Sequence, residues 1–198
     1  MTKFDTKYAA VAEFAAQNVV DSIHAMDHIN RVYNYAMDIA RHENGVNIDV
    51  LAVACLLHDI GQKEQFEDRK KDHAAIGAEK AFAWLVQNGH STDFASAVRD
   101  CVATHRFRTG NPPVSIEAKI LYDADKVDVC GAVGMARNLM YVGHMMWPLE
   151  SFLDEFKFKT EKVFMTLLTK RGTELAEKRK SAAQAFYGAM QAELKEYN

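Results

Sequence analysis

Helix-breaking residues are rare in this chain, and their rarity restricts the folds open to it. Only three prolines occur among 198 residues, and two of them are adjacent, Pro112 and Pro113. Ala, Leu, Met, Lys and Glu are frequent, whereas the alternation of β-branched residues that marks strands is scarce. No internal repeat, low-complexity tract or linker divides the sequence. We therefore predict an all-α fold in a single domain over 1–198, with about seven to eight helices.

Apolar spacing and end signals predict where these helices lie. The residues Asp72, Ser91 and Ser115 are suitable N-caps, and Gly61 and Pro148 are suitable stop signals. Two stretches rich in polar or helix-breaking residues, Gln62–Lys71 and Arg106–Pro113, are predicted to be loops. The predicted helices cover approximately 6–18, 25–43, 48–61, 72–87, 91–105, 115–129 and 131–147, followed by a long amphipathic helix interrupted near Gly172.

Composition and charge exclude several classes of protein. Twenty-four Lys and Arg residues stand against 27 Asp and Glu residues, a net charge of −3, which gives no electrostatic reason to expect nucleic-acid or membrane-surface binding. The three cysteines form no CxxC pair and indicate a reducing compartment. No apolar stretch approaches the roughly 20 residues that span a bilayer, and the N-terminus lacks the pattern of a signal peptide. We expect a soluble cytoplasmic protein.

Polar residues interrupt the apolar faces of three predicted helices. His28 heads one apolar stripe and His105 ends another, while Asp125 shares a face with Leu121. Taken singly, each is more often a core residue satisfied by a neighbouring polar group. A buried carboxylate is costly, however, unless it is paired, hydrogen-bonded or bound to a metal. Side chains from three helices distant in sequence are thus expected to point inward.

The dipeptide His58-Asp59 ends an apolar helix in the run CLLHDIG. Neighbouring residues of a helix point about 100° apart, so two of them share an ion only if it lies between them. The end of a helix allows this, because the backbone departs there. Imidazole with carboxylate suits Mn, Fe or Zn.

In this order, His28, His58-Asp59 and Asp125 resemble the H…HD…D pattern of the HD-domain metal-dependent phosphohydrolase superfamily, whose fold is an all-α bundle. The resemblance covers about 21–194 and implies an HD core at about 21–140, with C-terminal helices at about 149–197. Further stretches are similar to the small stand-alone bacterial branch that resembles nucleotide pyrophosphohydrolases: HAMDHINRV, LLHDIGQK, DHAAIGAEKA, ATHRF, EAKILYDADKVD and GAVGMAR.

The resemblance implies a role for each matching residue. The expected metal ligands are His28, His58, Asp59 and Asp125, and Mn²⁺ is the expected ion, with Fe, Ni, Co, Mg and Zn as alternatives. His73 and His105 match positions that hold a second metal in some relatives and face substrate phosphates in others. Asp59 is also the expected proton acceptor for the attacking water.

Charged residues beside these motifs are candidates for substrate binding and catalysis. Lys63 could neutralise phosphate charge and Glu64 could orient or deprotonate water, although such a charged run is more often a solvated loop. The other candidates for phosphate binding are Arg106, Arg108, Lys126 and Arg137.

We therefore expect hydrolysis of a phosphate ester or phosphoanhydride, most simply in a nucleotide, by an enzyme similar to nucleoside triphosphate pyrophosphohydrolases. The alternatives are a 5'-nucleotidase, a dinucleoside polyphosphate hydrolase, a dinuclear iron oxygenase and a non-catalytic nucleotide-binding helical module. The complete ligand set argues against the last of these. The expected partner is a phosphorylated small molecule, and the chain could form a homodimer.

Overall fold

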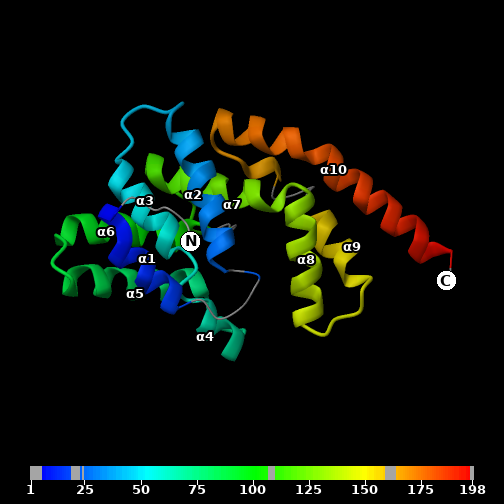
Figure 1. Cartoon of the computed structure of the whole chain (residues 1–198), viewed down its shortest axis with the longest axis horizontal. Coiled ribbons are helices and arrows are strands. Elements are labelled where there is room, and N and C mark those ends of the chain that lie inside the picture. The colour runs from blue at the N-terminus through cyan, green and yellow to red at the C-terminus, as the bar shows by residue number, and fades with distance from the viewer. Residues whose placement is uncertain (1–5, 19–22, 24, 107–109, 159–163, 197–198) are drawn as a thin grey trace. The chain divides into compact units, whose positions relative to one another are not determined.

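The computed structural model describes residues 6–18, 23, 25–106, 110–158 and 164–196 (Figure 1). All regular secondary structure in these ranges is helical, which confirms the all-α prediction. The chain divides into two compact units, Met1–Ala124 and Asp125–Asn198, and the boundary falls inside one helix. The organisation of the whole chain as a single domain stays a prediction.

The elements are divided between the two units in chain order. The first unit contains η1 (Thr6–Tyr8), α1 (Ala9–Gln17), α2 (Met26–Ala40), α3 (Ile48–Leu57), α4 (Gln62–Glu67), α5 (His73–Gln87), α6 (Thr92–Thr104) and most of α7 (Ile116–Val129). The second unit contains the end of α7, α8 (Ala132–His144), α9 (Ser151–Phe158), η3 (Phe164–Thr166) and α10 (Lys170–Lys195). Three predicted caps are present, because Asp72, Ser91 and Ser115 each accept a hydrogen bond from a backbone N–H of the first helical turn.

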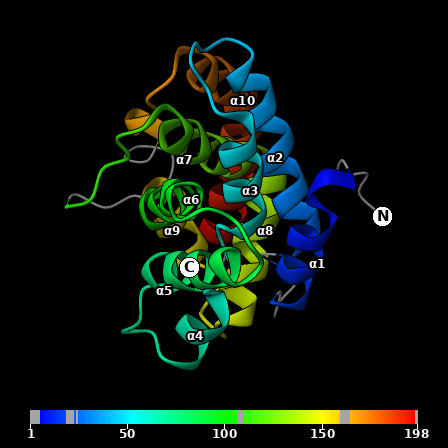
Figure 2. The ribbon, with the colours of Figure 1, turned by 90° about the vertical axis from the view of Figure 1, so that its left-hand side faces the viewer.

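Helix α3 is the centre of the first unit. Every residue from Val50 to Leu57 is buried, so this part of the helix has no solvent-facing side. It packs against α1, α2 and α6, and Figure 2 shows it between α2 and α6. A helix that is apolar on all sides belongs in an interior. The residues that follow it directly, His58 and Asp59, therefore emerge inside the protein.

A close contact between two glycines holds α5 against the chain that follows α3. A Cβ atom on Gly61 would lie 2.7 Å from the backbone nitrogen of Gly77 and would collide with the carbonyl oxygen of His73. Gly61 has a φ of −93°, so what requires glycine here is the lack of space for a side chain. The prediction that Gly61 ends the preceding helix is wrong, since α3 ends at Leu57 and Gly61 caps α4.

The prediction of a loop over Gln62–Lys71 is wrong in its first half, where the structure has the short helix α4. Lys80 of α5 forms hydrogen bonds that hold this polar segment in place. Its Nζ donates to the carbonyl oxygen of Ile60 and to Oε1 of Glu64, both at 3.0 Å. The buried side chain of Gln62 also contacts Asp59 and His73. Tertiary contacts thus outweigh the weak helical tendency of the segment.

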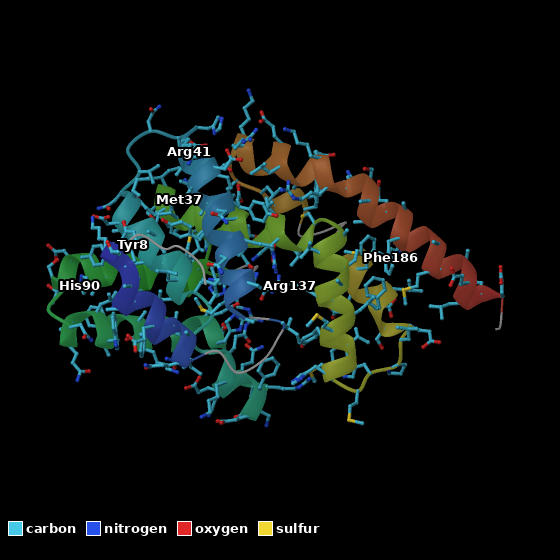
Figure 3. All side chains as sticks on the ribbon, viewed as in Figure 1. Tyr8, Met37, Arg41, His90, Arg137 and Phe186 are labelled. Carbon is cyan, nitrogen blue, oxygen red and sulfur yellow. The ribbon has the colours of Figure 1, made fainter. Side chains whose placement is uncertain are left out.

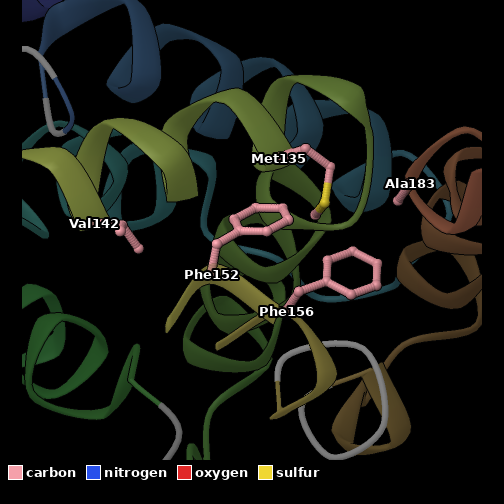
Figure 4. Close-up of a cluster of buried hydrophobic side chains, with 5 residues drawn as sticks. All are labelled: Met135, Val142, Phe152, Phe156 and Ala183. Carbon is pink, nitrogen blue, oxygen red and sulfur yellow. The ribbon is translucent and has the colours of Figure 1, made fainter. Parts of the chain in front are cut away.

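The second unit has its own apolar core between α8, α9 and α10 (Figure 4). The core residues are Met135, Val142, Phe152, Phe156 and Ala183. An interruption near Gly172 is present, as predicted: a new helix, α10, begins at Lys170 after η3, and Gly172 is buried in its first turn. Its N–H donates to Oγ1 of the cap residue Thr169 at 3.0 Å, so this glycine helps to begin the helix.

Within the described ranges, no helix is both long enough and apolar enough to cross a membrane.

We predict that Gly61→Ala destabilises the first unit by about 1–3 kcal/mol, the usual cost of overpacking a filled interior. Gly188→Ala is the matched control, because a Cβ atom at that position of α10 meets nothing within 4 Å. Urea unfolding followed by circular dichroism measures both variants. Equal midpoints for Gly61→Ala and the wild type would show that the two backbones can separate at no cost.

Candidate metal centre

Five predicted site residues of the first unit lie at the ends of four helices. His28 is in the first turn of α2, His58 and Asp59 follow α3, His73 begins α5, and His105 follows α6. All five are buried, and Asp59 is the most exposed at 8%. A solvated position for His73 is therefore excluded. Helix ends from distant parts of the sequence bring four imidazoles to one carboxylate.

The local fold fixes the tautomer of His58 and His105 in the same way. The Nδ1 of His58 lies 2.8 Å from the carbonyl oxygen of Cys55, and the Nδ1 of His105 lies 2.6 Å from that of Val102. A carbonyl oxygen only accepts, so each Nδ1 carries the proton and donates it. These carbonyls belong to the last helical turn, where backbone acceptors lack a partner in the helix. In the neutral ring, Nε2 is left with a lone pair that points into the site.

One oxygen of Asp59 faces the first histidine pair. The Nε2 atoms of His28 and His58 are 3.2 Å apart, and Asp59 Oδ2 lies 3.4 Å and 3.2 Å from them. Ligand atoms at about 2.1 Å from one ion are separated by about 3.0–3.4 Å in octahedral or tetrahedral geometry. The spacing of these three atoms therefore suits a single divalent cation.

The other oxygen of Asp59 faces the second histidine pair. The Nε2 atoms of His73 and His105 are also 3.2 Å apart, and Asp59 Oδ1 lies 3.3 Å and 3.5 Å from them. These three residues form a group with the proximity needed to hold an ion. The Nδ1 of His73 lies 2.8 Å from Oε1 of Gln65, so its Nε2 also carries a lone pair. Two lone pairs that face each other at this distance repel unless a cation lies between them.

The charges of the cluster suit a metal centre. Burial alone would raise the pKa of Asp59, but the surrounding imidazoles, His58 foremost, outweigh it and hold that pKa well below its usual range. Burial lowers the pKa of His73 to about 4, against a weaker opposing effect of Asp59. At neutral pH, Asp59 is therefore a carboxylate and His73 a neutral imidazole, the forms that coordinate metals.

The other predicted residues of the first unit lie on α4 or shortly after the end of α6. Lys63 is exposed on α4, and Glu64 pairs with Lys80 at 3.0 Å. Burial raises the pKa of Glu64, but the hydrogen bond from Lys80 more than compensates, so the pKa is lowered overall. Arg106 donates to Asp72 Oδ1 at 2.8 Å. It is thus held by a carboxylate at the start of α5.

The predicted residues of the second unit pair with one another. Lys126 Nζ lies 2.7 Å from Oδ2 of its neighbour Asp125 on α7. Arg137 of α8, labelled in Figure 3, donates to the buried Asp128 at 2.8 Å. The participation of Asp125 as a metal ligand, and of Lys126 and Arg137 in substrate binding, stays a prediction. Arg108 lies outside the described residues.

Sequence reasoning missed two glutamines of α4. Gln62 places its amide nitrogen 3.2 Å from both Asp59 Oδ1 and His73 Nε2, and Gln65 accepts from His73. Their spacing could have revealed them. Asp59, Gln62 and Gln65 follow one another at intervals of three residues, about one helical turn, which places them on one face of a helix. The signal was hidden because the segment was expected to be a loop.

The comparison with protein families identifies the class to which this fold and cluster belong. Residues 25–130 match the HD domain family. The match spans more than half of the 198 residues, so the chain belongs to the HD-domain superfamily.

Particular relatives agree with this assignment. The chain is 29% identical over 164 residues to the uncharacterized protein YpgQ of Bacillus subtilis (strain 168), a match that covers 79% of this chain and 77% of YpgQ. The crystal structure of YpgQ in complex with ADP superposes with a TM-score of 0.75, at 24% identity, over 93% of this chain and 96% of that one, and supports the fold. A predicted HD superfamily hydrolase from an uncultured Thermotogales bacterium gives a TM-score of 0.65 at 29% identity, over 95% and 91% of the two chains.

We predict that a divalent ion stabilises the protein against unfolding. At an ion concentration about 100 times its Kd, binding to the folded state adds about 2.7 kcal/mol, so chelation should lower the melting temperature by roughly 5–10 °C. His58→Ala, which removes a ligand of the first histidine pair, should reduce this difference. His90→Ala is the control, because His90 is an exposed histidine between α5 and α6 (Figure 3). A wild-type melting temperature that does not respond to chelator or added Mn²⁺ would contradict the prediction.

A second prediction concerns pH. In the metal-free protein, folded His73 stays neutral down to a pKa of about 4, whereas in the unfolded chain it takes up a proton near its ordinary pKa of 6.5. Protons bound by the unfolded state alone favour unfolding. The free energy of unfolding should therefore fall as the pH decreases from about 6.5 to about 4, by up to about 3 kcal/mol from this residue. Urea unfolding of chelator-treated protein should show a shallower slope in His73→Gln, and an unchanged slope would refute the assignment.

Proposed function

We propose that this chain is a metal-dependent phosphohydrolase that cleaves a phosphoanhydride or phosphate ester of a nucleotide. One observation carries the proposal: two pairs of buried imidazole Nε2 atoms face separate oxygens of the Asp59 carboxylate. Imidazole with carboxylate suits first-row divalent ions. Two relatives support the reaction class, since one is a predicted HD superfamily hydrolase and the other has been crystallised with ADP.

The residues of the first unit would hold the metal in two groups. His28, His58 and Oδ2 of Asp59 form one group, to which the H…HD…D pattern adds Asp125. His73, His105 and Oδ1 of Asp59 form the other group and would hold a second ion. We propose Mn²⁺ as the ion, with Fe, Ni, Co, Mg and Zn as alternatives. When bound, the metal lowers the pKa of water and neutralises phosphate charge.

Asp59 has a role besides coordination. A carboxylate whose pKa lies well below its usual range is a weak base, because the driving force for proton transfer to it is small. We propose that Asp59 acts first as a ligand and orients the attacking water by accepting its hydrogen bond. Glu64 is the other candidate catalytic acid, and its ion pair with Lys80 balances its charge.

Substrate phosphates would be bound by cations that already have carboxylate partners. Arg106 pairs with Asp72, Lys126 with Asp125 and Arg137 with Asp128. A phosphate must compete with these carboxylates, which favours a substrate with several negative charges, such as a nucleoside polyphosphate. Lys63 is exposed and carries its charge on the surface of α4. We also propose that the protein is cytoplasmic, where nucleotides are abundant. We propose further that it belongs to the branch similar to nucleotide pyrophosphohydrolases.

The test is release of phosphate or pyrophosphate from a panel of nucleoside mono-, di- and triphosphates, with Mn²⁺, Co²⁺, Ni²⁺ or Mg²⁺. Asp59→Ala should reduce the rate by roughly 100-fold or more, because it removes an oxygen from both histidine groups. Glu67→Ala, an exposed acid at the end of α4, is the matched control and should keep the wild-type rate.

Two results would contradict the proposal. No release from any nucleotide with any of the four metals would favour a nucleotide-binding module without turnover. Consumption of oxygen by the iron-loaded protein in place of hydrolysis would favour an oxygenase.

A further inference from the structure

The side-chain oxygen of Gln65 is a point of convergence for three donors. Gln65 Oε1 lies 2.8 Å from Nδ1 of His73, 3.1 Å from the backbone N of the same residue and 3.1 Å from Nη1 of Arg106. Gln65 belongs to α4 and His73 begins α5, so these bonds join two helices. An oxygen with two lone pairs that serves three donors is fully engaged in holding its neighbours.

His73 depends on this oxygen because of its place in the fold. His58 and His105 follow the last turn of their helices and donate Nδ1–H to a carbonyl of that turn. His73 stands at the opposite end of its helix, where the backbone presents N–H groups. No carbonyl three residues earlier in the same helix exists for it. An acceptor must come from another element, and Gln65 supplies it.

Arg106 and Asp72 in turn hold Gln65. The guanidinium of Arg106 donates to Gln65 Oε1 and to Oδ1 of Asp72, which also caps α5 by accepting from the N–H of Ala74. Because a guanidinium only donates, it requires the oxygen of the Gln65 amide, and not the nitrogen, to face it. The same oxygen then faces His73. The orientation of the amide is thereby fixed from two sides.

We propose that Gln65 is a positioning residue that fixes the ring orientation and the tautomer of His73, and so makes the His73–His105 pair available to a divalent ion. The proposal rests on the metal binding in the proposed function. It gives His73 a support that differs from that of His58 and His105, which are each held by a carbonyl of their own helix. Within α4, Gln65 fixes a residue of the second pair, whereas His58 of the first pair is fixed by a carbonyl of its own helix.

Two variants separate the hydrogen bond from the volume of the side chain. Gln65→Met has nearly the same length and removes the acceptor, while Gln65→Glu keeps an acceptor oxygen. Glu67→Met, on the exposed side of the same helix, is the matched control. Equilibrium dialysis with Mn²⁺ alone, followed by metal analysis, counts the ions bound by each chain.

We expect two Mn²⁺ ions per chain in the wild type, Gln65→Glu and Glu67→Met. In Gln65→Met, the weaker of the two binding steps should lose about 10–100-fold in affinity, the usual effect of removing the hydrogen-bond partner of a ligating imidazole, while the first step is retained. Loss of both steps would count against the proposal. If Gln65→Met folds poorly, Gln65→Asn replaces it in the test. This variant shortens the side chain by one methylene and should cause the same loss of affinity in the weaker binding step.

A second readout is independent of metal and of activity. In chelator-treated protein at neutral pH, ¹⁵N NMR of the histidine rings should find the proton of His73 on Nδ1 in the wild type and in Gln65→Glu. Gln65→Met should give a mixture of tautomers. Wild-type stoichiometry and an unchanged tautomer in Gln65→Met would overturn the proposal, as would a wild type that binds a single ion. Failure to release phosphate, with both readouts as expected, would instead reject the hydrolase assignment alone.

Discussion

A single buried carboxylate among four imidazoles sets the requirements that the first unit of this protein meets. Asp59 is costly to bury, and the histidines around it, His58 foremost, hold it ionised. The fold meets the cost by ending or beginning four helices at the same place. Helix ends supply what helix middles cannot, because their unpaired carbonyls fix imidazole rings while the departing backbone lets adjacent side chains converge. The apolar α3 delivers the carboxylate to the interior.

Much of this arrangement could be predicted from the sequence. The near absence of helix breakers indicated an all-α fold, and the caps Asp72, Ser91 and Ser115 lie where expected. The polar residues on apolar faces, His28 and His105, are buried in one cluster. These features are local, since they depend on periodicity and end signals that short stretches of sequence contain.

The errors have a common physical origin. The segment that begins at Gln62 has the composition of a surface loop, and only tertiary contacts order it as α4: Lys80 on one side and the fit of Gly61 against Gly77 on the other. Gly61 was expected to end the preceding helix, but it lies at the start of α4, where it packs against Gly77. In each place a partner distant in sequence, or a cap, outweighs the propensity of the residue itself. The contacts of Gln62 and Gln65 with the cluster were hidden for the same reason.

The contact between Gly61 and Gly77 has a consequence for how this protein tolerates change. At this joint backbone meets backbone, so the separation of α5 from the start of α4 is set by van der Waals contact between main-chain atoms, and only a side chain added at the glycine itself would widen it. Variation elsewhere on the exposed surfaces of α4 and α5 is then uncoupled from the spacing of the ligands. The outer faces of these helices can therefore differ among relatives, or be redesigned, while the spacing of the ligands inside stays the same.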